Sequence, residues 1–220
     1  MKMLLTSGGV KNSSLHKALV ELLGKPISAA NALCIPTAAH AQANAPMHVY
    51  RFVTGYWQNG MCELGWKTLG VLELTAMPSI PREKWIKDLQ ETDVLLVNGG
   101  DPLYLNYWMV QSGVAELLPT LDHLTYVGLS AGSMIMAPHI GEDFVNWRPP
   151  AGGDKTLGLI DFSIFPHLGH PDLPDNNIYT ARDWAKNLNN PGYAIDDETA
   201  FKVVDGKVEV ISEGTWELLS

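Results

Sequence analysis

A serine between two glycines is the strongest chemical signal in this sequence. Gly128, Ser130 and Gly132 form a G-x-S-x-G pattern that begins at the end of the apolar run 125–129. This pattern is typical of a tight turn between a strand and a helix, which holds the serine Oγ exposed above the sheet edge. The next N–H, that of Ala131, then lies at a helix N-terminus. The pattern predicts a nucleophilic Ser130 with half of an oxyanion hole; the alternative is a turn without chemistry.

A serine nucleophile needs a general base, and His167 is the histidine that we expect to serve. His167 lies just past the C-terminal end of the predicted strand 162–165. We assign this strand to the parallel sheet that also holds 125–129, so His167 should reach the same rim as Ser130. His170 is the alternative base. His167, His170 and Asp172 also form an H-x-x-H-x-D cluster, but no fourth metal ligand can be named elsewhere. We therefore predict no metal and no other cofactor.

A second glycine-rich loop follows the apolar strand 93–97. Its residues are Asn98, Gly99, Gly100, Asp101 and Pro102. Asp101 is expected to cap a helix that begins at Pro102. Because Gly99 and Gly100 carry no side chain, we also expect one of their N–H groups to join that of Ala131 in the oxyanion hole.

Strands and helices are predicted to alternate along most of the chain, which favours one α/β domain over residues 1–220 with a parallel sheet covered on both faces. The expected strands are 3–6, 32–36, 66–69, 93–97, 125–129 and 162–165. The expected helices are 15–23, capped by Ser13 or Ser14, then 50–58, 84–89 and 179–188. The tail should add antiparallel strands at 193–195, 200–204 and 208–211, which complete the same sheet.

The composition argues against several classes of partner. The net charge of −9 and the scattered Lys and Arg residues argue against a nucleic acid or an anionic membrane, and favour a small-molecule substrate. No apolar run matches a signal peptide or the ~18 residues of a membrane span, so we expect a cytoplasmic protein. Cys34 and Cys62 fit reduced, buried thiols.

Four motifs together resemble one family. GLSAGSM around Ser130, VNGGDPLYL over 97–105, FPHLGH around His167 and IDDETA over 195–200 are similar to the dipeptidase E and cyanophycinase family of serine peptidases. The spacing from Ser130 to His167 resembles the dipeptidase E branch. The resemblance implies a three-layer α/β sandwich with a mostly parallel sheet, class I glutamine amidotransferase-like (flavodoxin-like). It also implies removal of N-terminal aspartate from short peptides through an acyl-enzyme, without a metal.

The resemblance also suggests the remaining site residues. It implies an acid from the loop after the elbow helix, where Glu142 and Asp143 stand side by side. Because neighbouring side chains of an extended segment point in opposite directions, only one should face His167, and the choice stays open. Glu198 is the fallback. Arg182 resembles the arginine that binds the acidic side chain of the substrate; the alternative is a solvated helix arginine.

Other readings of the sequence fit less well. A glutamine amidotransferase would need a cysteine at the elbow and a His-x-Glu pair, but Ser130 and Gly169 occupy those positions. Cyanophycinases are usually longer, and an α/β-hydrolase esterase normally places its histidine nearer the C-terminus. A non-catalytic metabolite-binding protein, a cyanophycinase-like enzyme and a general esterase stay as alternatives. A short peptide is the expected ligand, and a homodimer is a candidate assembly.

Overall fold

The strands define the frame of the molecule. The computed structural model describes residues 1–219. Its strands are β1 (Lys2–Thr6), β2 (Asn31–Ile35), β3 (Thr68–Val71), β4 (Val94–Val97), β5 (Thr125–Leu129), β6 (Ser163–Phe165), β7 (Gly192–Ile195), β8 (Thr199–Val204), β9 (Lys207–Ser212) and β10 (Trp216–Leu219).

Helices connect most of these strands. The α-helices are α1 (Ser13–Leu23), α2 (Ala45–Val53), α3 (Ile86–Gln90), α4 (Pro102–Gln111), α5 (Val114–Leu117), α6 (Ala131–Met134) and α7 (Ile178–Ala185). Short 3₁₀-helices are η1 (Ile27–Ala29), η2 (Thr37–Ala41), η3 (Met77–Ser79), η4 (Arg82–Lys84), η5 (Leu118–Thr120) and η6 (Glu142–Phe144).

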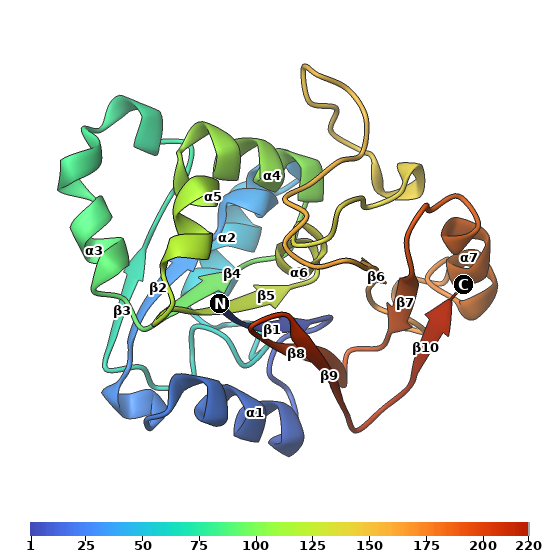
Figure 1. Cartoon of the computed structure of the whole chain (residues 1–220), viewed down its shortest axis with the longest axis horizontal. Helices are drawn as coiled ribbons and strands as arrows, with labels where there is room; N and C mark the ends of the chain where they lie inside the picture. Colours follow the sequence, from blue (N-terminus) through green and yellow to red (C-terminus); the bar gives the residue numbers. More distant parts are fainter. Residues whose placement is uncertain (220) are drawn as a thin grey trace.

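The central sheet is mostly parallel. Within the described residues its strand order is β3-β2-β4-β5-β1-β8-β9. The strands from β3 to β1 are parallel, whereas β8 runs antiparallel to β1 and β9 antiparallel to β8. The carboxyl ends of β1, β2, β4 and β5 therefore share one rim, and the start of β8 lies at that same rim (Figure 1).

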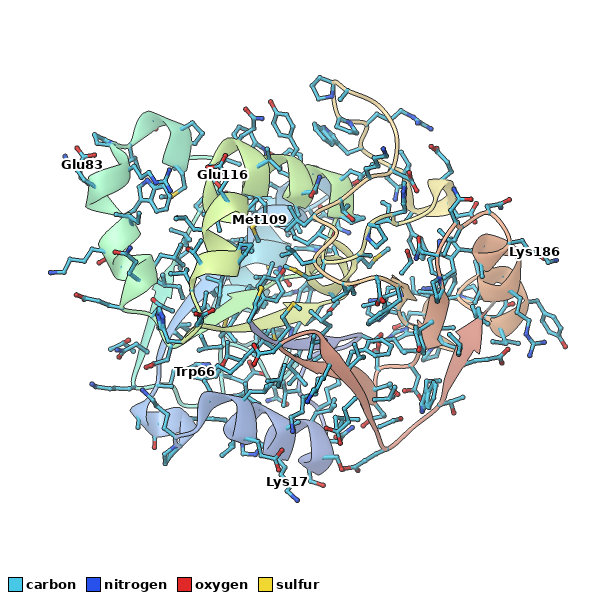
Figure 2. All side chains as sticks on the ribbon, in the orientation of Figure 1. Lys17, Trp66, Glu83, Met109, Glu116 and Lys186 are labelled. Carbon is cyan, nitrogen blue, oxygen red and sulfur yellow. The ribbon has the colours of Figure 1, made fainter. Side chains whose placement is uncertain are left out.

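Helices cover both faces of this sheet. One face packs Leu5, Leu95 and Tyr126 against side chains of α4 and α5, including Met109. The other face packs Leu4 and neighbouring strand residues against α1 and α2. In Figure 1, α1 lies below the sheet, and α4 and α5 lie above it. Figure 2 shows Met109 in the interior and the charged residues Lys17, Glu83 and Lys186 pointing outward. The expected α/β sandwich with a mostly parallel sheet is confirmed.

The C-terminal part forms a second sheet, which the sequence did not predict. Strand β6 pairs with β7 in parallel, and β10 pairs with β7 in the antiparallel direction. This smaller sheet packs against α7 through Phe165 and Trp184, at the right of Figure 1. The prediction that 162–165 and 193–195 belong to the central sheet is therefore wrong, although 200–204 and 208–211 do join it.

Several predicted boundaries shift. Asn12, rather than Ser13 or Ser14, caps α1, because its Oδ1 accepts from the N–H of Leu15 at 2.9 Å. The second helix begins at Ala45, ahead of the predicted 50–58. The third strand begins two residues after the predicted 66–69. Asp101 caps α4 as expected, accepting from the N–H of Tyr104 at 2.8 Å.

The cysteines are free and buried, as the sequence predicted. A contact with Cys34, together with burial, raises the pKa of the Cys62 thiol. No helix among residues 1–219 combines the length and apolar composition needed to cross a bilayer.

Candidate active site

Ser130 stands on a strained turn between β5 and α6. Its backbone has φ +51°, a region that residues with side chains rarely adopt and that clusters at functional sites. A Cβ on Gly128 would lie 2.6 Å from the Gly132 carbonyl oxygen, and a Cβ on Gly132 would lie 2.4 Å from the Val97 carbonyl oxygen, so the two glycines allow the helix to approach β5 and β4 this closely. The N–H of Ser130 donates to the carbonyl oxygen of Thr6 at 3.1 Å, which fixes the turn to the end of β1.

His167 faces the serine, as the sequence predicted. The Ser130 Oγ lies 2.8 Å from Nε2 of His167. His167 follows β6 and also has a positive φ of +60°, so both residues of this pair stand in uncommon backbone conformations. The two side chains meet although β6 lies in the smaller sheet, because Leu168 N–H donates to the carbonyl oxygen of Ile195 and brings this loop to the rim.

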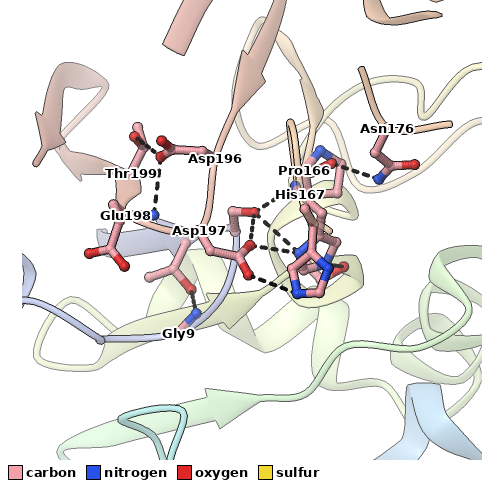
Figure 3. A network of polar contacts seen from close by, with 12 residues as sticks. Gly9, Pro166, His167, Asn176, Asp196, Asp197, Glu198 and Thr199 are labelled. Carbon is pink, nitrogen blue, oxygen red and sulfur yellow. Dashed lines mark hydrogen bonds and ion pairs between the residues drawn. The ribbon is translucent and has the colours of Figure 1, made fainter. Parts of the chain in front are cut away.

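The carboxylate behind His167 belongs to Asp197. Its Oδ1 lies 2.7 Å from Nδ1 of His167, on the opposite side of the ring from Ser130. Figure 3 shows the Asp197 carboxylate directed at His167, whereas the Glu198 side chain points away. With Nδ1 donating to Asp197, Nε2 is free to accept the hydroxyl proton of Ser130. This is the order of contacts that a serine nucleophile, its base and an orienting acid require.

The topology explains how Asp197 reaches this place. Strand β8 runs antiparallel to β1, with Ala200 opposite Thr6. The residues just before β8 therefore arrive at the rim where the parallel strands end. Asp197 stands in the connection from β7 to β8, at the junction of the two sheets. A carboxylate at this point can face His167, which approaches from the smaller sheet.

The expectation that Glu142 or Asp143 faces His167 is wrong. Both are exposed and lie in and around η6, where Glu142 is 3.6 Å from the Arg148 guanidinium. They line a separate hollow beside Trp184. The fallback, Glu198, is also directed elsewhere: its Oε2 accepts from Nδ2 of Asn12 at 2.9 Å, next to the cap of α1. One sequence signal could have found Asp197: adjacent carboxylates at the start of a strand predicted to close the sheet.

Two backbone N–H groups next to Ser130 are available for an oxyanion. Gly99 N–H donates to Oδ1 of its neighbour Asn98 at 2.8 Å, so it is already engaged. Among the described residues, the N–H groups of Gly100 and Ala131 have no partner. Gly100 has φ +141°, and a Cβ there would overlap the Ala38 backbone. Of the two glycines proposed from the sequence, the geometry favours Gly100 together with Ala131.

A cleft of about 660 Å³ opens beside these groups. Besides Ser130, His167 and Asp197, its walls include Gly8, Lys11, Trp57, Gly100, His170 and Asp172. The lining of the cleft therefore combines glycine backbone with charged and aromatic side chains. It is concave and large enough for a small ligand.

A family model supplies the decisive comparison. The model described as Peptidase family S51 matches residues 3–211. This chain belongs to peptidase family S51. The resemblance to the dipeptidase E family is thereby confirmed.

Relatives of this member of family S51 match over part of the chain. "Uncharacterized peptidase PM1590" of Pasteurella multocida (strain Pm70) is 34% identical over 89 residues, which cover 36% of this chain and 41% of that protein. "Peptidase E" of Streptomyces coelicolor (strain ATCC BAA-471 / A3(2) / M145) is 35% identical over 88 residues, which cover 38% of this chain and 35% of that protein. The chain thus spans about two fifths of the length of these relatives.

Two solved structures share the S51 chain's fold. A putative peptidase E protein from Listeria monocytogenes EGD-e superposes with a TM-score of 0.65 at 19% identity, covering 97% of this chain and 98% of that one. A peptidase from an acI-B1 Actinobacterium gives a TM-score of 0.67 at 17% identity, covering 99% and 90%. Both support the peptidase E fold, consistent with a class I glutamine amidotransferase-like architecture.

Arg182 lies away from the cleft of this member of family S51. It stands on α7, with its side chain 52% exposed, and its guanidinium makes a two-point contact with the Glu217 carboxylate at 2.9 and 3.0 Å. The structure therefore does not bring Arg182 together with Ser130. The cation that does line the cleft is Lys11, with Nζ 3.3 Å from Oδ2 of Asp197.

His170 and Asp172, two residues of the H-x-x-H-x-D pattern, also line the cleft. The N–H of Asp172 donates to Nδ1 of His170 at 3.1 Å, and Nε2 of His170 is 3.8 Å from Oδ2 of Asp197. Within residues 1–219, no three His, Cys, Asp or Glu side chains are grouped so as to hold a metal ion.

The surroundings of Asp197 favour its charged form. Burial alone would raise the pKa of this carboxyl, but the hydrogen bond and charge of His167, the Ser7 hydroxyl and the Lys11 ammonium lower the pKa well below its ordinary value of 3.8. Asp197 thus stays ionised throughout the neutral and mildly acidic range, which suits a carboxylate that holds an imidazole.

This lowered pKa predicts a pH dependence of stability. A carboxyl whose pKa is lower in the folded chain stabilises the fold above its unfolded pKa, and this contribution is lost as the pH falls through the folded pKa. We therefore expect Asp197→Asn to reduce the free energy of unfolding at pH 5–6, with the difference from wild type shrinking below about pH 4. Urea denaturation at a series of pH values measures this. Glu142→Gln is the control, and a gap that widens on acidification would contradict the prediction.

Proposed function

We propose that this chain is a serine peptidase that hydrolyses short peptides through an acyl-enzyme on Ser130. The observation that carries the proposal is the continuous network from Asp197 through His167 to Ser130, with contacts of 2.7 and 2.8 Å. Membership of peptidase family S51 supports the choice of an amide bond as the target.

Each residue of the network has one role in the proposed reaction. Nε2 of His167 removes the hydroxyl proton as Ser130 Oγ attacks the peptide carbonyl carbon. The N–H groups of Gly100 and Ala131 stabilise the negative oxygen of the tetrahedral intermediate. Asp197 stabilises the imidazolium, which then gives its proton to the leaving amine. Water, deprotonated by His167, hydrolyses the ester and restores Ser130.

A serine-directed probe tests this proposal. A fluorophosphonate should phosphonylate Ser130 of the wild-type chain, because only an activated hydroxyl reacts with it. Mass spectrometry of the peptide around Ser130 locates the adduct. Absence of any adduct in folded wild-type protein would favour the non-catalytic, metabolite-binding alternative. Turnover of p-nitrophenyl esters without cleavage of any peptide or aminoacyl-p-nitroanilide would favour the general esterase.

We further propose that the preferred substrates carry an N-terminal aspartate, as the family resemblance suggests, and that Lys11 rather than Arg182 binds its side chain. Lys11 lines the cleft and is partly exposed, and its ammonium already lies beside a carboxylate, that of Asp197. An acidic group in the cleft needs such a cation, since a buried carboxylate without a partner costs several kcal/mol. Among the described residues that line the cleft, Asp172 is the carboxylate that does not belong to the network of Ser130, His167 and Asp197. Its negative charge supports Asp172 as the group that binds the free N-terminal ammonium of the substrate.

A panel of aminoacyl-p-nitroanilides tests this specificity. Wild type should cleave the Asp substrate at least about tenfold faster than the Ala or Leu substrates, as one charge-assisted contact allows. Lys11→Met should reduce the ratio of kcat/KM for Asp over Ala toward one. The ratio is the readout, because Lys11 also contacts Asp197 and its loss can slow every substrate. Arg182→Met is the matched control and should keep the wild-type ratio; a loss of preference there would restore Arg182 as the clamp.

A further inference from the structure

Ser7 lies directly beneath the proposed active site. It is the first residue after β1 and has none of its surface exposed. The next residue, Gly8, lines the cleft, whereas Ser7 lies under it. A fully buried hydroxyl does not bind substrate, so any influence that Ser7 has on the reaction must pass through its neighbours.

The Ser7 hydroxyl contacts both residues behind the nucleophile. It accepts a hydrogen bond from the backbone N–H of His167 at 2.7 Å. It donates its own proton to Oδ1 of Asp197 at 2.8 Å, the same oxygen that faces Nδ1 of His167. Its oxygen is also 3.5 Å from that Nδ1. One side chain thus fixes the main chain of the base and the carboxylate of the acid.

The preceding residue, Thr6, performs the matching task for the nucleophile. Its carbonyl oxygen accepts from the N–H of Ser130 at 3.1 Å and from Oγ of Ser133 at 2.7 Å. The end of β1 therefore contacts all three members of the network through two consecutive residues. This is the point where the central sheet meets the loops of the smaller sheet.

Such an anchor is needed because His167 and Asp197 do not stand on regular elements. His167 has a positive φ of +60° in a loop after β6, and Asp197 stands in the connection between β7 and β8. Proton transfer requires the groups to stay within about 0.5 Å of their productive positions, which loops alone do not ensure. The backbone contact to His167 holds a conformation that is uncommon for a residue with a side chain.

We propose that Ser7 is a positioning residue of this site, which holds His167 and Asp197 in register with Ser130. The inference rests on the proposed serine peptidase mechanism. Ser7 orients the Asp197 carboxylate so that Oδ1 accepts hydrogen bonds both from the Ser7 hydroxyl and from Nδ1 of His167. Through the His167 backbone, Ser7 also holds the imidazole ring so that Nε2 points at Ser130.

The test compares Ser7→Ala with Ser133→Ala. Both variants remove one buried serine hydroxyl near the end of β1, but that of Ser133 contacts only the Thr6 carbonyl. We expect Ser7→Ala to lower kcat by about 10- to 100-fold, as misplacement of a reacting group by roughly 1 Å does, while KM changes less than about threefold. Ser133→Ala should keep kcat within about threefold of wild type. Equal kcat losses in the two variants would overturn the proposal.

Two further measurements separate positioning from a general loss of stability. Ser7→Thr keeps a hydroxyl and should recover most of the activity, whereas Ser7→Cys, a weaker hydrogen-bonding group, should not. This pair also serves if Ser7→Ala does not fold. The downfield NMR signal of the His167 Nδ1 proton should shift or broaden in Ser7→Ala and stay in Ser133→Ala; an unchanged signal would contradict the role.

The failure of this inference is distinguishable from that of the proposed function. If wild type does not react with the fluorophosphonate, the serine peptidase proposal fails and the Ser7 inference fails with it. If wild type reacts and Ser7→Ala reacts at the same rate, only the role of Ser7 is refuted. If Ser7→Ala reacts more slowly in proportion to its loss of kcat, both proposals are supported.

Discussion

Ser130→Ala is expected to reduce kcat for a cleaved peptide by about 10⁶-fold while the fold is kept. Loss of the nucleophile of a serine triad removes nearly everything that the three residues contribute, because they act as a unit. What is left comes from the oxyanion hole and from binding, about 10³- to 10⁴-fold over water. The measurement is steady-state hydrolysis of the best p-nitroanilide of the panel, with circular dichroism as the check of folding.

The matched control for this variant is Ser133→Ala, three residues along the same turn. Its hydroxyl donates to the backbone of Thr6 and does not reach His167. It should keep activity within about threefold, because the reacting groups stay in place. If Ser130→Ala retained turnover near that of wild type, Ser130 would not be the nucleophile.

Asp197→Asn should lower kcat by about 10⁴-fold. An amide in this place no longer holds the imidazole in the tautomer that leaves Nε2 free to accept, and it does not stabilise the imidazolium. Because the Asn side chain is nearly the same size, the cleft and KM should change little. The pH dependence of kcat/KM and the probe-labelling rate give two independent readings of the loss.

Glu142→Gln and Asp143→Asn distinguish this assignment from the one based on the sequence. Both residues are exposed, and neither contacts the ring of His167. Each variant should therefore keep kcat within about twofold of wild type. If instead one of them lost activity by orders of magnitude and Asp197→Asn did not, the assignment of the acid to Asp197 would be wrong.

The placement of Ser130 on a tight turn was predictable because a local pattern determines it. The glycines at 128 and 132 permit the strained turn at Ser130, and that turn depends on five consecutive residues. His167 was found for a partly wrong reason, since β6 lies in the smaller sheet rather than the central one. Its meeting with Ser130 depends on the contacts that the loop after β6 makes with Ser7, at the end of β1, and with Ile195, at the end of β7.

Asp197 was missed because the pairing partner of a strand and its register are not written in a local pattern. Placing it required knowing that β8 pairs with β1, with Ala200 opposite Thr6. The next residue, Glu198, points to the opposite side of the chain, where its side chain contacts Asn12.

Arg182 shows the limit of a spacing argument. Its distance in sequence from His167 matched the resemblance, but strand β10, which was not predicted, supplies Glu217 as its partner. A long-range ion pair of this kind has no signature in the sequence near Arg182. The candidate homodimer is untested, and sedimentation would measure the oligomeric state.

The antiparallel pairing of β8 with β1 has a consequence for biosynthesis. The ribosome releases the segment with Ser130, and then the one with His167, well before residues 196–204 emerge and pair with the first strand. A nascent chain therefore carries a complete elbow without the proposed acid. On the proposed mechanism, hydrolytic activity requires the C-terminal part to pair with the N-terminal strand, so we expect unfinished translation products and chains cut before residue 196 to be inactive.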